Sequence, residues 1–376
     1  MTDIETIVHL VPTLHNRSAG TTDAVLKLAS HQAQLGFTVE VWTLAPDRQS
    51  DELFIRQLDP TVKISFFKRT DILRSLGLSW SMFSALYKRW DHISIVHTHL
   101  LWMMPCMISG FVRCLKKRSS TKLVFSPHGS LTHYSLARSA LKKKLVWALF
   151  QHFTVTRCNQ IILTSDVEEQ ELPSNFKQYP TTIVSLGIEY SDIRLPKDNT
   201  IVFLSRIDPK KNVDLAIISF LEAEAYIKGY KLDVYGPDAN TAYVQRIKDL
   251  CNTTPGVTYH GPIYGTNKLK ILSKANFLVL PTDSENFGLV IGEAMSVGTT
   301  CLTTTSTPWD ILSTHQLGWC VDKQNFKRTF ATIVAFDKKI FEAYGSRCQS
   351  YVRKNYNWHK AASDTINVYR IDNDKL

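Results

Sequence analysis

The chain has 376 residues, and its 44 lysines and arginines outnumber its 34 aspartates and glutamates, which gives a formal net charge of +10. With 44% hydrophobic and 21% charged residues, its composition is that of an ordinary globular protein and excludes wholesale disorder and fibrous repeats. The longest apolar run, residues 100–112, is broken by Pro105 and is shorter than the roughly 20 residues that a membrane span needs.

Short apolar, β-branched runs alternate with longer amphipathic stretches through the first half of the chain. The predicted strands are residues 6–12, 37–44, 62–67, 93–97, 122–126, 160–164 and 182–186. Several are apolar on both faces, as in a parallel sheet that helices cover on each side. Between the first two strands, residues 22–35 predict a helix that Gly36 ends. The alternation predicts a doubly wound α/β domain over residues 1–190.

The same pattern restarts after a polar segment at residues 188–199. Predicted strands at residues 200–205, 231–235, 257–260 and 276–280 alternate with predicted helices at residues 213–226, 243–251 and 266–274. They indicate a second α/β domain over residues 191–350, followed by a helical tail over residues 351–376. The predicted fold is therefore two Rossmann-like, doubly wound domains that face a central cleft. Ligands are expected at the carboxyl ends of the strands.

One segment of the second half carries the most specific pattern, an apolar strand followed by a short loop and a helix. Gly288 in the loop allows close backbone approach, and the amides of Phe287, Gly288 and Leu289 lie at the expected helix start, where they suit phosphate or hydroxyl oxygens. Glu285 and Glu293 could each accept two hydrogen bonds from vicinal sugar hydroxyls. A single glutamate of this kind is more often a solvated helix residue, so the specificity lies in the whole segment.

Another strand-to-loop segment places two cations five positions apart, Arg206 and Lys211. Across a turn they could converge on one anion, the arginine as a planar fork and the lysine as a point charge. A surface loop whose cations pair with Asp208 and Asp214 is an equally good interpretation of this segment alone.

Three weaker signals lie in the first half of the chain. Gly20 precedes the first predicted helix and could bring backbone amides close to a diphosphate, although a plain turn fits equally well. His128, in a Pro-His-Gly sequence after a strand, has a functional role at the cleft edge or a structural one. His97 and His99 suit one strand face, but no third ligand is evident in the sequence, so no metal site is predicted.

Taken together, these segments resemble the retaining, nucleotide-sugar-dependent glycosyltransferases of family 4, which have the GT-B fold. The resemblance covers nearly the whole chain and is strongest over residues 202–322. It implies that Glu285 and Glu293 are the paired glutamates of the family. It also implies that Arg206 and Lys211 hold the donor diphosphate.

The resemblance extends to residues outside that range. It implies that His128 approaches the donor sugar and that Gly20 forms part of the N-terminal glycine loop. The closing helix, residues 351–376, resembles the segment that crosses back onto the N-terminal domain. Three positions depart from the family pattern. Ala19 replaces a loop glycine, Ser205 replaces the glycine before the arginine, and Asn286 stands where glycine is common.

The implied reaction moves a hexose from a nucleotide diphosphate to an acceptor hydroxyl with retained anomeric configuration, in polysaccharide, lipopolysaccharide or glycolipid assembly. Arg206 and Lys211 would stabilise the charge that develops on the leaving diphosphate. Such stabilisation could replace a divalent metal, and the only Asp-x-Asp triplet is residues 372–374. No metal and no cofactor are expected, and the expected partners are the nucleotide sugar and a sugar or lipid-linked acceptor.

The excess of positive charge lies in one block, residues 92–165, which contain ten lysines or arginines and no aspartate or glutamate. Lys142, Lys143 and Lys144, among several leucines and near Arg138, predict a basic amphipathic helix that docks on an anionic membrane. A core helix with a solvated lysine face is the alternative. No DNA- or RNA-binding motif accompanies the block, so nucleic acid is not an expected partner.

Seven scattered cysteines, with no two at metal-ligand spacing, favour a reducing compartment over a disulfide framework. The sequence opens with Asp3 and Glu5 rather than a basic segment, so no secretory signal is expected. The expected location is the cytoplasm, peripheral on the inner membrane face if the basic block docks. The alternatives to a transferase are a non-catalytic nucleotide-sugar-binding subunit and an epimerase or phosphorylase on the same fold.

Overall fold

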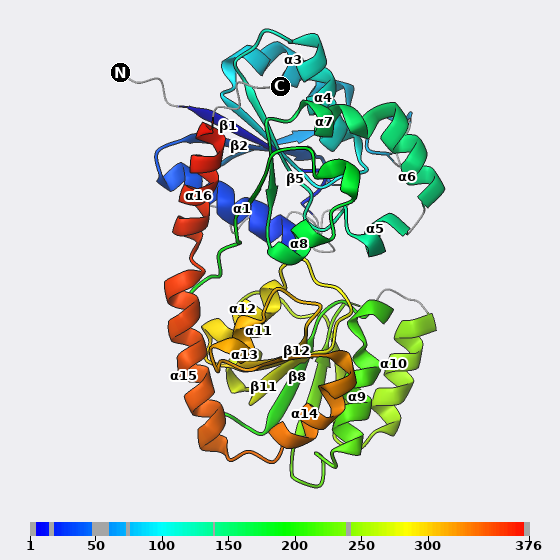
Figure 1. The fold of residues 1–376 in the computed structure, drawn as a ribbon, viewed down its shortest axis with the longest axis vertical. Coiled ribbons are helices and arrows are strands. Elements are labelled where there is room, and N and C mark those ends of the chain that lie inside the picture. Colours follow the sequence, from blue (N-terminus) through cyan, green and yellow to red (C-terminus); the bar gives the residue numbers. More distant parts are fainter. Residues whose placement is uncertain are drawn as a thin grey trace. The chain divides into compact units, whose positions relative to one another are not determined.

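In the computed structural model the chain forms two compact units. The first contains residues Met1–Gly187 together with Trp358–Leu376, and the second contains Ile188–Asn357. Figure 1 labels their helices and strands. The structure describes residues 5–14, 19–46, 60–72, 76–137, 140–237 and 242–371.

A seven-stranded parallel sheet forms the centre of the first unit. Its strands in spatial order are β3 (Lys63–Phe67), β2 (Thr38–Leu44), β1 (Thr6–Leu10), β4 (Ile95–His99), β5 (Lys122–Ser126), β6 (Gln160–Leu163) and β7 (Thr181–Ile183). Five of them, β1, β2, β4, β5 and β6, are almost wholly buried, as expected for a parallel sheet with helices on both faces. The strand order reverses between β1 and β4, which are hydrogen-bonded neighbours.

Two helices far apart in the sequence lie side by side in this unit (Figure 1). They are α1 (Ala19–Gln34) and α16 (Trp358–Arg370). Gly187 lies against the first residue of α16, since an added Cβ at this position would lie 2.6 Å from the Cα of Trp358. Tyr369 of α16 lies in the same apolar cluster as strands β1 and β2. Other helices of this unit are α3 (Trp80–Arg89), α4 (Met104–Leu115), α5 (His133–Ala137), α6 (Ala140–Val146), α7 (His152–Arg157) and α8 (Asp166–Gln170).

A six-stranded parallel sheet forms the centre of the second unit. Its strands in spatial order are β10 (Val257–Gly261), β9 (Lys231–Tyr235), β8 (Thr200–Leu204), β11 (Phe277–Leu280), β12 (Thr300–Thr304) and β13 (Trp319–Val321). The strand order reverses between β8 and β11. Its helices include α9 (Val213–Glu222), α10 (Ala242–Thr253), α11 (Gly265–Lys274), α12 (Leu289–Ser296), α13 (Ile311–Thr314), α14 (Phe326–Ile333) and α15 (Lys338–Asn355). Two parallel sheets flanked by helices confirm the prediction of two Rossmann-like domains.

The helical tail differs in detail from the prediction. A returning helix was expected from residue 351, but α15 runs unbroken to Asn355 inside the second unit. The break follows at Tyr356, whose backbone angles of φ −124° and ψ 67° are not helical. Residues 351–357 therefore belong to the second unit, and the chain returns to the first unit only from Trp358 onward.

Two further expectations concern the whole chain. None of the described helices is long and apolar enough to cross a membrane. All seven cysteines are free thiols, and most of them are buried in the two cores. The absence of disulfides agrees with the scattered cysteine spacing.

Candidate functional site

Two loops of the second unit follow strands that meet where the sheet order reverses. One loop connects β8 to α9, and the other connects β11 to α12. In doubly wound folds, ligands bind outside the carboxyl ends of the strands at such a point. The predicted residues Arg206 and Lys211 lie on the first loop, and Glu285 lies on the second.

The position of Lys211 is fixed by hydrogen bonds that tie one loop to the other. Asn212, which follows it, adopts a left-handed backbone conformation with φ +48° before α9 begins. The side-chain amide of Asn212 donates to the carbonyl oxygen of Pro281 at 2.8 Å. The backbone amide of Asp283 donates to the carbonyl oxygen of Lys210, also at 2.8 Å. Asn212 is thus a positioning residue that no motif in the sequence had singled out.

The ammonium of Lys211 is in direct contact with the carboxylate of Glu285. Its Nζ atom also lies 3.3 Å from Thr282 Oγ1 and 3.3 Å from the carbonyl oxygen of Ser284. The exposed fractions of the lysine and glutamate side chains are 4% and 20%. The lysine is therefore enclosed by the second loop, while its carboxylate partner keeps an open side.

Burial, followed by the charges of Lys210 and Arg206, lowers the pKa of Lys211 well below its ordinary value. The carboxylate of Asp208 acts in the opposite sense on this pKa, because a nearby negative charge favours the ammonium form. Arg206 is exposed on the same loop. An anion that reached this loop would contact one exposed and one buried cation. It would then share with Glu285 the neutralisation of the Lys211 charge.

The start of α12 is built around Gly288, which has φ +77°. An added Cβ at this position would lie 3.1 Å from Cγ of Glu285 and 3.2 Å from Nε1 of Trp309. The Trp309 Nε1–H group donates to the carbonyl oxygen of Phe287 at 2.5 Å, and this buried hydrogen bond holds the loop in place. The helix begins at Leu289 with no side-chain cap, so its first amides stay available to a ligand.

Only one of the two motif glutamates is helical. Because α12 begins at Leu289, Glu285 lies in the loop, as predicted, and Glu293 lies one turn inside the helix. The carboxylate of Glu293 pairs with the ammonium of Lys268 on α11. Lys268 was not predicted as a site residue, because it lies on a separate helix outside any motif. Asn286 is half-buried in the loop.

In the first unit, His128 lies in a tight turn after β5. Its backbone is left-handed with φ +48°, and Gly129 follows with φ +76°. The Gly129 amide donates to Oε1 of Glu168 at 2.6 Å, and the amide and hydroxyl of Thr164 donate to Oε2. Burial lowers the pKa of His128 to about 4, so its ring is neutral near pH 7. Glu168, a buried carboxylate that the sequence analysis missed, therefore fastens the turn that presents His128.

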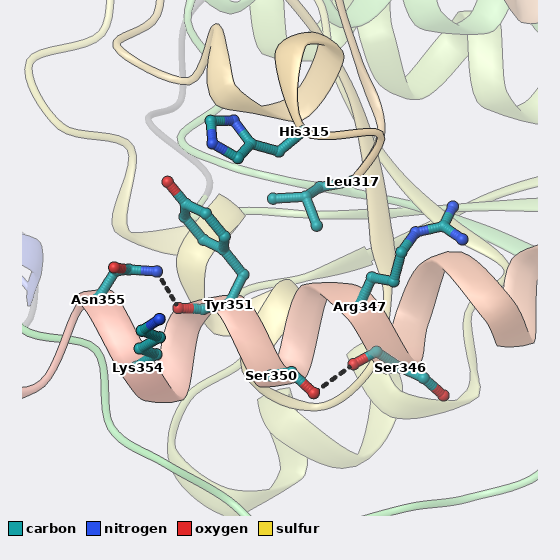
Figure 2. Close-up of a pocket in the computed structure, with 8 residues that line it drawn as sticks. All are labelled: His315, Leu317, Ser346, Arg347, Ser350, Tyr351, Lys354 and Asn355. Atoms are coloured by element: carbon teal, nitrogen blue, oxygen red, sulfur yellow. Dashed lines mark hydrogen bonds between the residues drawn. The ribbon is translucent and has the colours of Figure 1, made fainter.

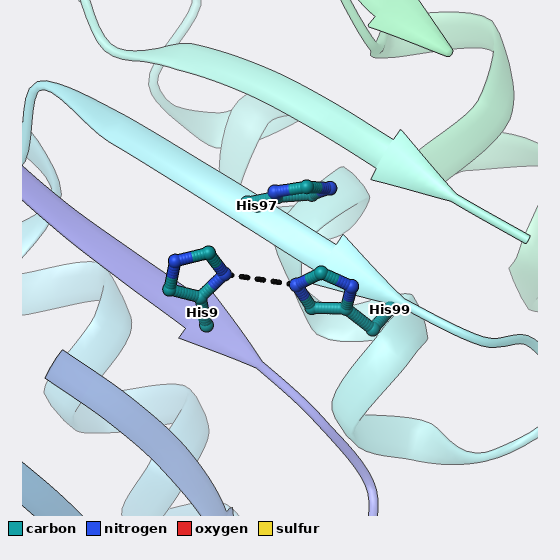
Figure 3. A group of neighbouring side chains, drawn as sticks. All are labelled: His9, His97 and His99. Carbon is teal, nitrogen blue, oxygen red and sulfur yellow. Dashed lines mark hydrogen bonds between the residues drawn. The ribbon is translucent and has the colours of Figure 1, made fainter. Parts of the chain in front are cut away.

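A third histidine joins the pair that the sequence had singled out. His9 on β1 is in register with His97 on the neighbouring β4, and its Nδ1 lies 2.9 Å from Nε2 of His99 (Figure 3). One ring nitrogen from each of the three lies within 4.8 Å of the others, and all three rings are buried. Only the strand order brings His9 to this place, which is why the sequence showed no third ligand.

Two other features lie away from these residues. Gly20 is exposed in the first turn of α1 rather than ahead of the helix, and residues 15–18 lie outside the described part of the chain. A groove of about 700 Å³ runs along α15 and is lined by residues such as His315, Arg347 and Tyr351 (Figure 2). None of the predicted site residues lines this groove.

Two family models match adjoining parts of the chain. Residues 19–191 match the model described as Glycosyltransferase Family 4, and residues 191–335 match the model described as Glycosyl transferases group 1. The chain belongs to glycosyltransferase family 4. The paired glutamates and the two loop cations that suggested this family from the sequence both lie within the second matched region.

Among curated relatives of this family 4 glycosyltransferase are D-inositol 3-phosphate glycosyltransferases. The one from Mycolicibacterium paratuberculosis is 27% identical over 309 residues, which are 73% of this chain and 67% of the relative. The one from Mycolicibacterium smegmatis is 26% identical over 231 residues, which are 55% of this chain and 51% of the relative. The matched part thus spans about half to two thirds of these relatives.

Solved structures of glycosyltransferases share the fold over nearly the whole chain. Anabaena HepE in complex with UDP and glucose is 12% identical, with a TM-score of 0.73 and coverage of 97% of this chain and 99% of HepE. Sucrose-phosphate synthase from Thermosynechococcus elongatus is 19% identical, with a TM-score of 0.69 and coverage of 97% and 98%. At these identities the likeness concerns the fold, which is GT-B.

Proposed function

We propose that this family 4 glycosyltransferase is a retaining hexosyltransferase that moves a hexose from a nucleotide diphosphate to an acceptor hydroxyl. The observation that carries the proposal is the contact between Lys211 and Glu285 at the point where the second sheet reverses its order. It places a buried ammonium, a partly open carboxylate and the start of a helix in one small region. A sugar diphosphate presents both anionic oxygens and vicinal hydroxyls, which these groups complement.

Each donor group has a matching side chain. The diphosphate takes the exposed Arg206, the buried Lys211 and the first amides of α12, around Leu289. The hexose hydroxyls take the open side of Glu285. The ribose hydroxyls take Glu293, which must exchange its ion pair with Lys268 for them. Asn286, Phe287 and Gly288 shape the loop between, and the family resemblance assigns His128 to the sugar and Gly20 to the diphosphate.

The reaction breaks the bond between the anomeric carbon and the diphosphate oxygen and forms one to the acceptor oxygen on the same face. Negative charge develops on the leaving diphosphate, and Arg206 with Lys211 stabilises it without a metal ion. A leaving phosphate oxygen takes the proton of the acceptor hydroxyl. Because Lys211 is held by the interlocked loops before any ligand arrives, little reorganisation is needed at that step.

The acceptor is proposed to be lipid-linked and presented at an anionic membrane, within polysaccharide, lipopolysaccharide or glycolipid assembly. Leu141, Leu145 and Leu149, spaced four apart along α6 and the helical turn after it, are 84%, 61% and 51% exposed. Lys144 is exposed beside them. An apolar ridge within the acid-free segment complements an anionic lipid surface by both hydrophobic burial and charge.

The basic residues of this segment are not all available to a membrane. Lys143, which was predicted to face it, is turned inward, because its ammonium donates to the carbonyl oxygen of Ser135 and lies 5.4 Å from the ring centroid of Trp102. Arg138 and the side chain of Lys142 lie outside the described part of the structure. The proposed membrane contact therefore rests on the leucine ridge and Lys144.

The test of the transferase proposal is a panel of uridine, guanosine and adenosine diphosphate hexoses. One of them is expected to bind and thereby raise the melting temperature of the protein. At a ligand concentration 100-fold above Kd, binding adds about 2.7 kcal/mol to the free energy of unfolding. Product analysis with and without an acceptor then separates transfer from the alternatives, which are epimerisation, phosphorolysis and binding without turnover. If no nucleotide sugar shifts the melting temperature, the proposal fails.

A further inference from the structure

A chain of buried polar side chains leads from helix α1 to His128. Oε1 of Gln32 on α1 lies 2.7 Å from Nε2 of His9, and Nδ1 of His9 lies 2.9 Å from Nε2 of His99. Nδ1 of His99 in turn lies 2.9 Å from Nε2 of His128. Gln32 and His9 are fully buried and His99 is 1% exposed, so within this chain each ring nitrogen depends on its neighbour for a hydrogen bond.

The direction of the hydrogen bonds follows from the first of them. A carbonyl oxygen only accepts, so the proton between Gln32 and His9 belongs to Nε2 of the histidine. A neutral imidazole carries one N–H, which leaves Nδ1 of His9 as an acceptor for the Nε2–H of His99. Nδ1 of His99 is then likewise an acceptor, so Nε2 of His128 must donate to it. This leaves Nδ1 of His128 with its lone pair. Burial keeps the rings neutral, since it lowers the pKa of His9 and of His128 to about 4.

We propose that Gln32 is a positioning residue that selects the Nε2–H tautomer of His128 through His9 and His99. His128 then presents Nδ1 as a hydrogen-bond acceptor, suited to a sugar hydroxyl that donates. The functional part of this inference rests on the proposed function, which assigns His128 to the donor sugar. The selection of the tautomer itself does not depend on that assignment.

The returning helix α16 supplies the partner of the other end of the Gln32 amide. Nε2 of Gln32 donates to the hydroxyl of Tyr369 at 3.2 Å. That hydroxyl lies 2.7 Å from Nδ1 of His97, and Nε2 of His97 lies 2.8 Å from Oγ of Ser126. If the amide were reversed, every proton along the histidine chain would reverse with it. The tautomer of a residue in the turn after β5 is therefore coupled to a tyrosine more than 200 residues away in the sequence.

The same contacts account for the three histidines of Figure 3 without a metal ion. All six ring nitrogens of His9, His97 and His99 already have hydrogen-bond partners within the network. A metal held between Nδ1 of His9 and Nε2 of His99 would need both lone pairs and would displace the shared proton. Metal binding and tautomer selection thus exclude each other, so a metal analysis can decide between them.

The experiment is nitrogen-15 NMR of the full chain with labelled histidine, in which long-range couplings distinguish Nε2–H from Nδ1–H tautomers. A His128→Asn spectrum identifies the resonances of His128. The expected result is Nε2–H at His128 in the wild type, and loss of that single tautomer in Gln32→Met, which removes the acceptor. Gln32→Glu keeps an acceptor and is expected to restore it.

The matched control is Thr98→Val. Thr98 lies between His97 and His99 on the opposite strand face and bonds to Ser109 Oγ, so the variant loses a buried hydrogen bond of the same strand and leaves the histidine chain intact. It is expected to keep the wild-type tautomer. Nδ1–H at His128 in the wild type, an unchanged His128 signal in Gln32→Met, or one equivalent of bound metal would each overturn the proposal.

If Gln32→Met does not fold, the wild-type spectrum alone still decides the tautomer. Activity gives the functional readout, since Gln32→Met is expected to lower kcat about tenfold with donor affinity nearly unchanged, as for the loss of one hydrogen bond. Gln32→Glu is expected to recover most of that loss. Should no nucleotide sugar bind at all, the proposed function fails while the tautomer result stands.

Discussion

The ammonium of Lys211 touches the carboxylate of Glu285, although 74 residues separate them in the sequence. The contact joins the loop after β8 to the loop after β11, and one side-chain and one backbone hydrogen bond hold the two loops together. A cation enclosed in this way is placed before the ligand arrives. In the proposed reaction, its charge acts on the leaving diphosphate at the moment of bond breaking.

Replacing Lys211 by methionine is expected to lower turnover about 100-fold or more, as for the loss of one preorganised charge-stabilising donor. The measurement is kcat at saturating nucleotide sugar. Lys327→Met is the control, because Lys327 forms an exposed ion pair with Glu222 in the same unit and should matter little to activity or stability. Turnover of Lys211→Met within a few-fold of wild type would refute the assigned role.

Removing the second motif carboxylate by Glu293→Ala is expected to reduce turnover by a similar factor of about 100. The loss should include a weaker affinity for the donor, since Glu293 is assigned to the ribose. Isothermal titration with the bare nucleoside diphosphate checks this, because that ligand contains the ribose but no hexose. An unchanged affinity would mean that Glu293 does not bind the donor and has only a structural role, in its ion pair with Lys268.

Gly288→Ala tests the geometry at the start of α12. The backbone strain at φ +77° costs about 1 kcal/mol, and the new Cβ also presses on Glu285 and Trp309. Gly229→Ala is a matched control, because Gly229 has φ +81° and nothing within 4 Å of an added Cβ. The strain from the positive φ should lower the thermal stability of both variants. Only Gly288→Ala should also weaken donor binding, by about tenfold. Equal donor affinities would contradict the role of this loop.

Glu168→Ala is expected to destabilise the first unit by about 3 kcal/mol, because it leaves the half-buried amide of Gly129 and the buried amide of Thr164 without their acceptor. The neighbouring Glu169→Ala removes an exposed carboxylate with one hydrogen bond to Thr181 and should cost well under 1 kcal/mol. Urea unfolding measures both. A small loss for Glu168→Ala would mean that another group holds the His128 turn.

Acid should destabilise the first unit earlier than carboxylate protonation alone would. Burial lowers the pKa of His9 from 6.5 to about 4, so between these values the unfolded chain binds a proton that the folded chain does not. Stability therefore falls as the pH falls through this window, by about 2 kcal/mol at pH 5 for a group with that shift. Melting temperatures from pH 7 to 4.5 measure the slope, and His9→Gln should flatten it. A slope unaffected by His9→Gln would contradict burial of a neutral ring.

The leucine ridge of α6 predicts binding to vesicles that contain anionic phosphatidylglycerol. Replacing Leu141, Leu145 and Leu149 by serine should lower vesicle binding at least about tenfold, since each buried leucine contributes on the order of 1–2 kcal/mol. Leu221→Ser on α9 is the control, because that leucine is 42% exposed but lies outside the acid-free segment. The difference in binding between these vesicles and neutral phosphatidylcholine vesicles gives the contribution of charge. Unchanged sedimentation with vesicles would exclude the ridge.

The alternation of apolar runs predicted the architecture, because each apolar run marks a segment that the fold buries. Every strand expected in the first half is present within a few residues, and so are those expected from residue 200 to 280. Local signals also placed Arg206, Lys211 and Glu285 on loops after strands, since a strand end and a helix start are both visible in sequence. The predicted helix over residues 213–226 ends early at Glu222, because Glu224 adopts a positive φ of 49°.

Contacts between distant segments could not be predicted in the same way. Lys268 reaches Glu293 from a separate helix, and Glu168 reaches the His128 turn from α8. His9 meets His99 only because β1 and β4 are neighbours across the reversal of the sheet. In each case the partner belongs to an ordinary residue type without a local motif, and its role arises from topology alone.

The return of α16 to the first unit has a consequence for biosynthesis. Trp358 and Tyr369 complete the core of that unit, yet they are translated after every residue of the second unit, Ile188–Asn357. Because domains fold as units during vectorial synthesis, the second unit has its whole sequence available first. The unit that is begun first on the ribosome is thus the last to be finished, and until then the face of α1 that α16 covers stays exposed.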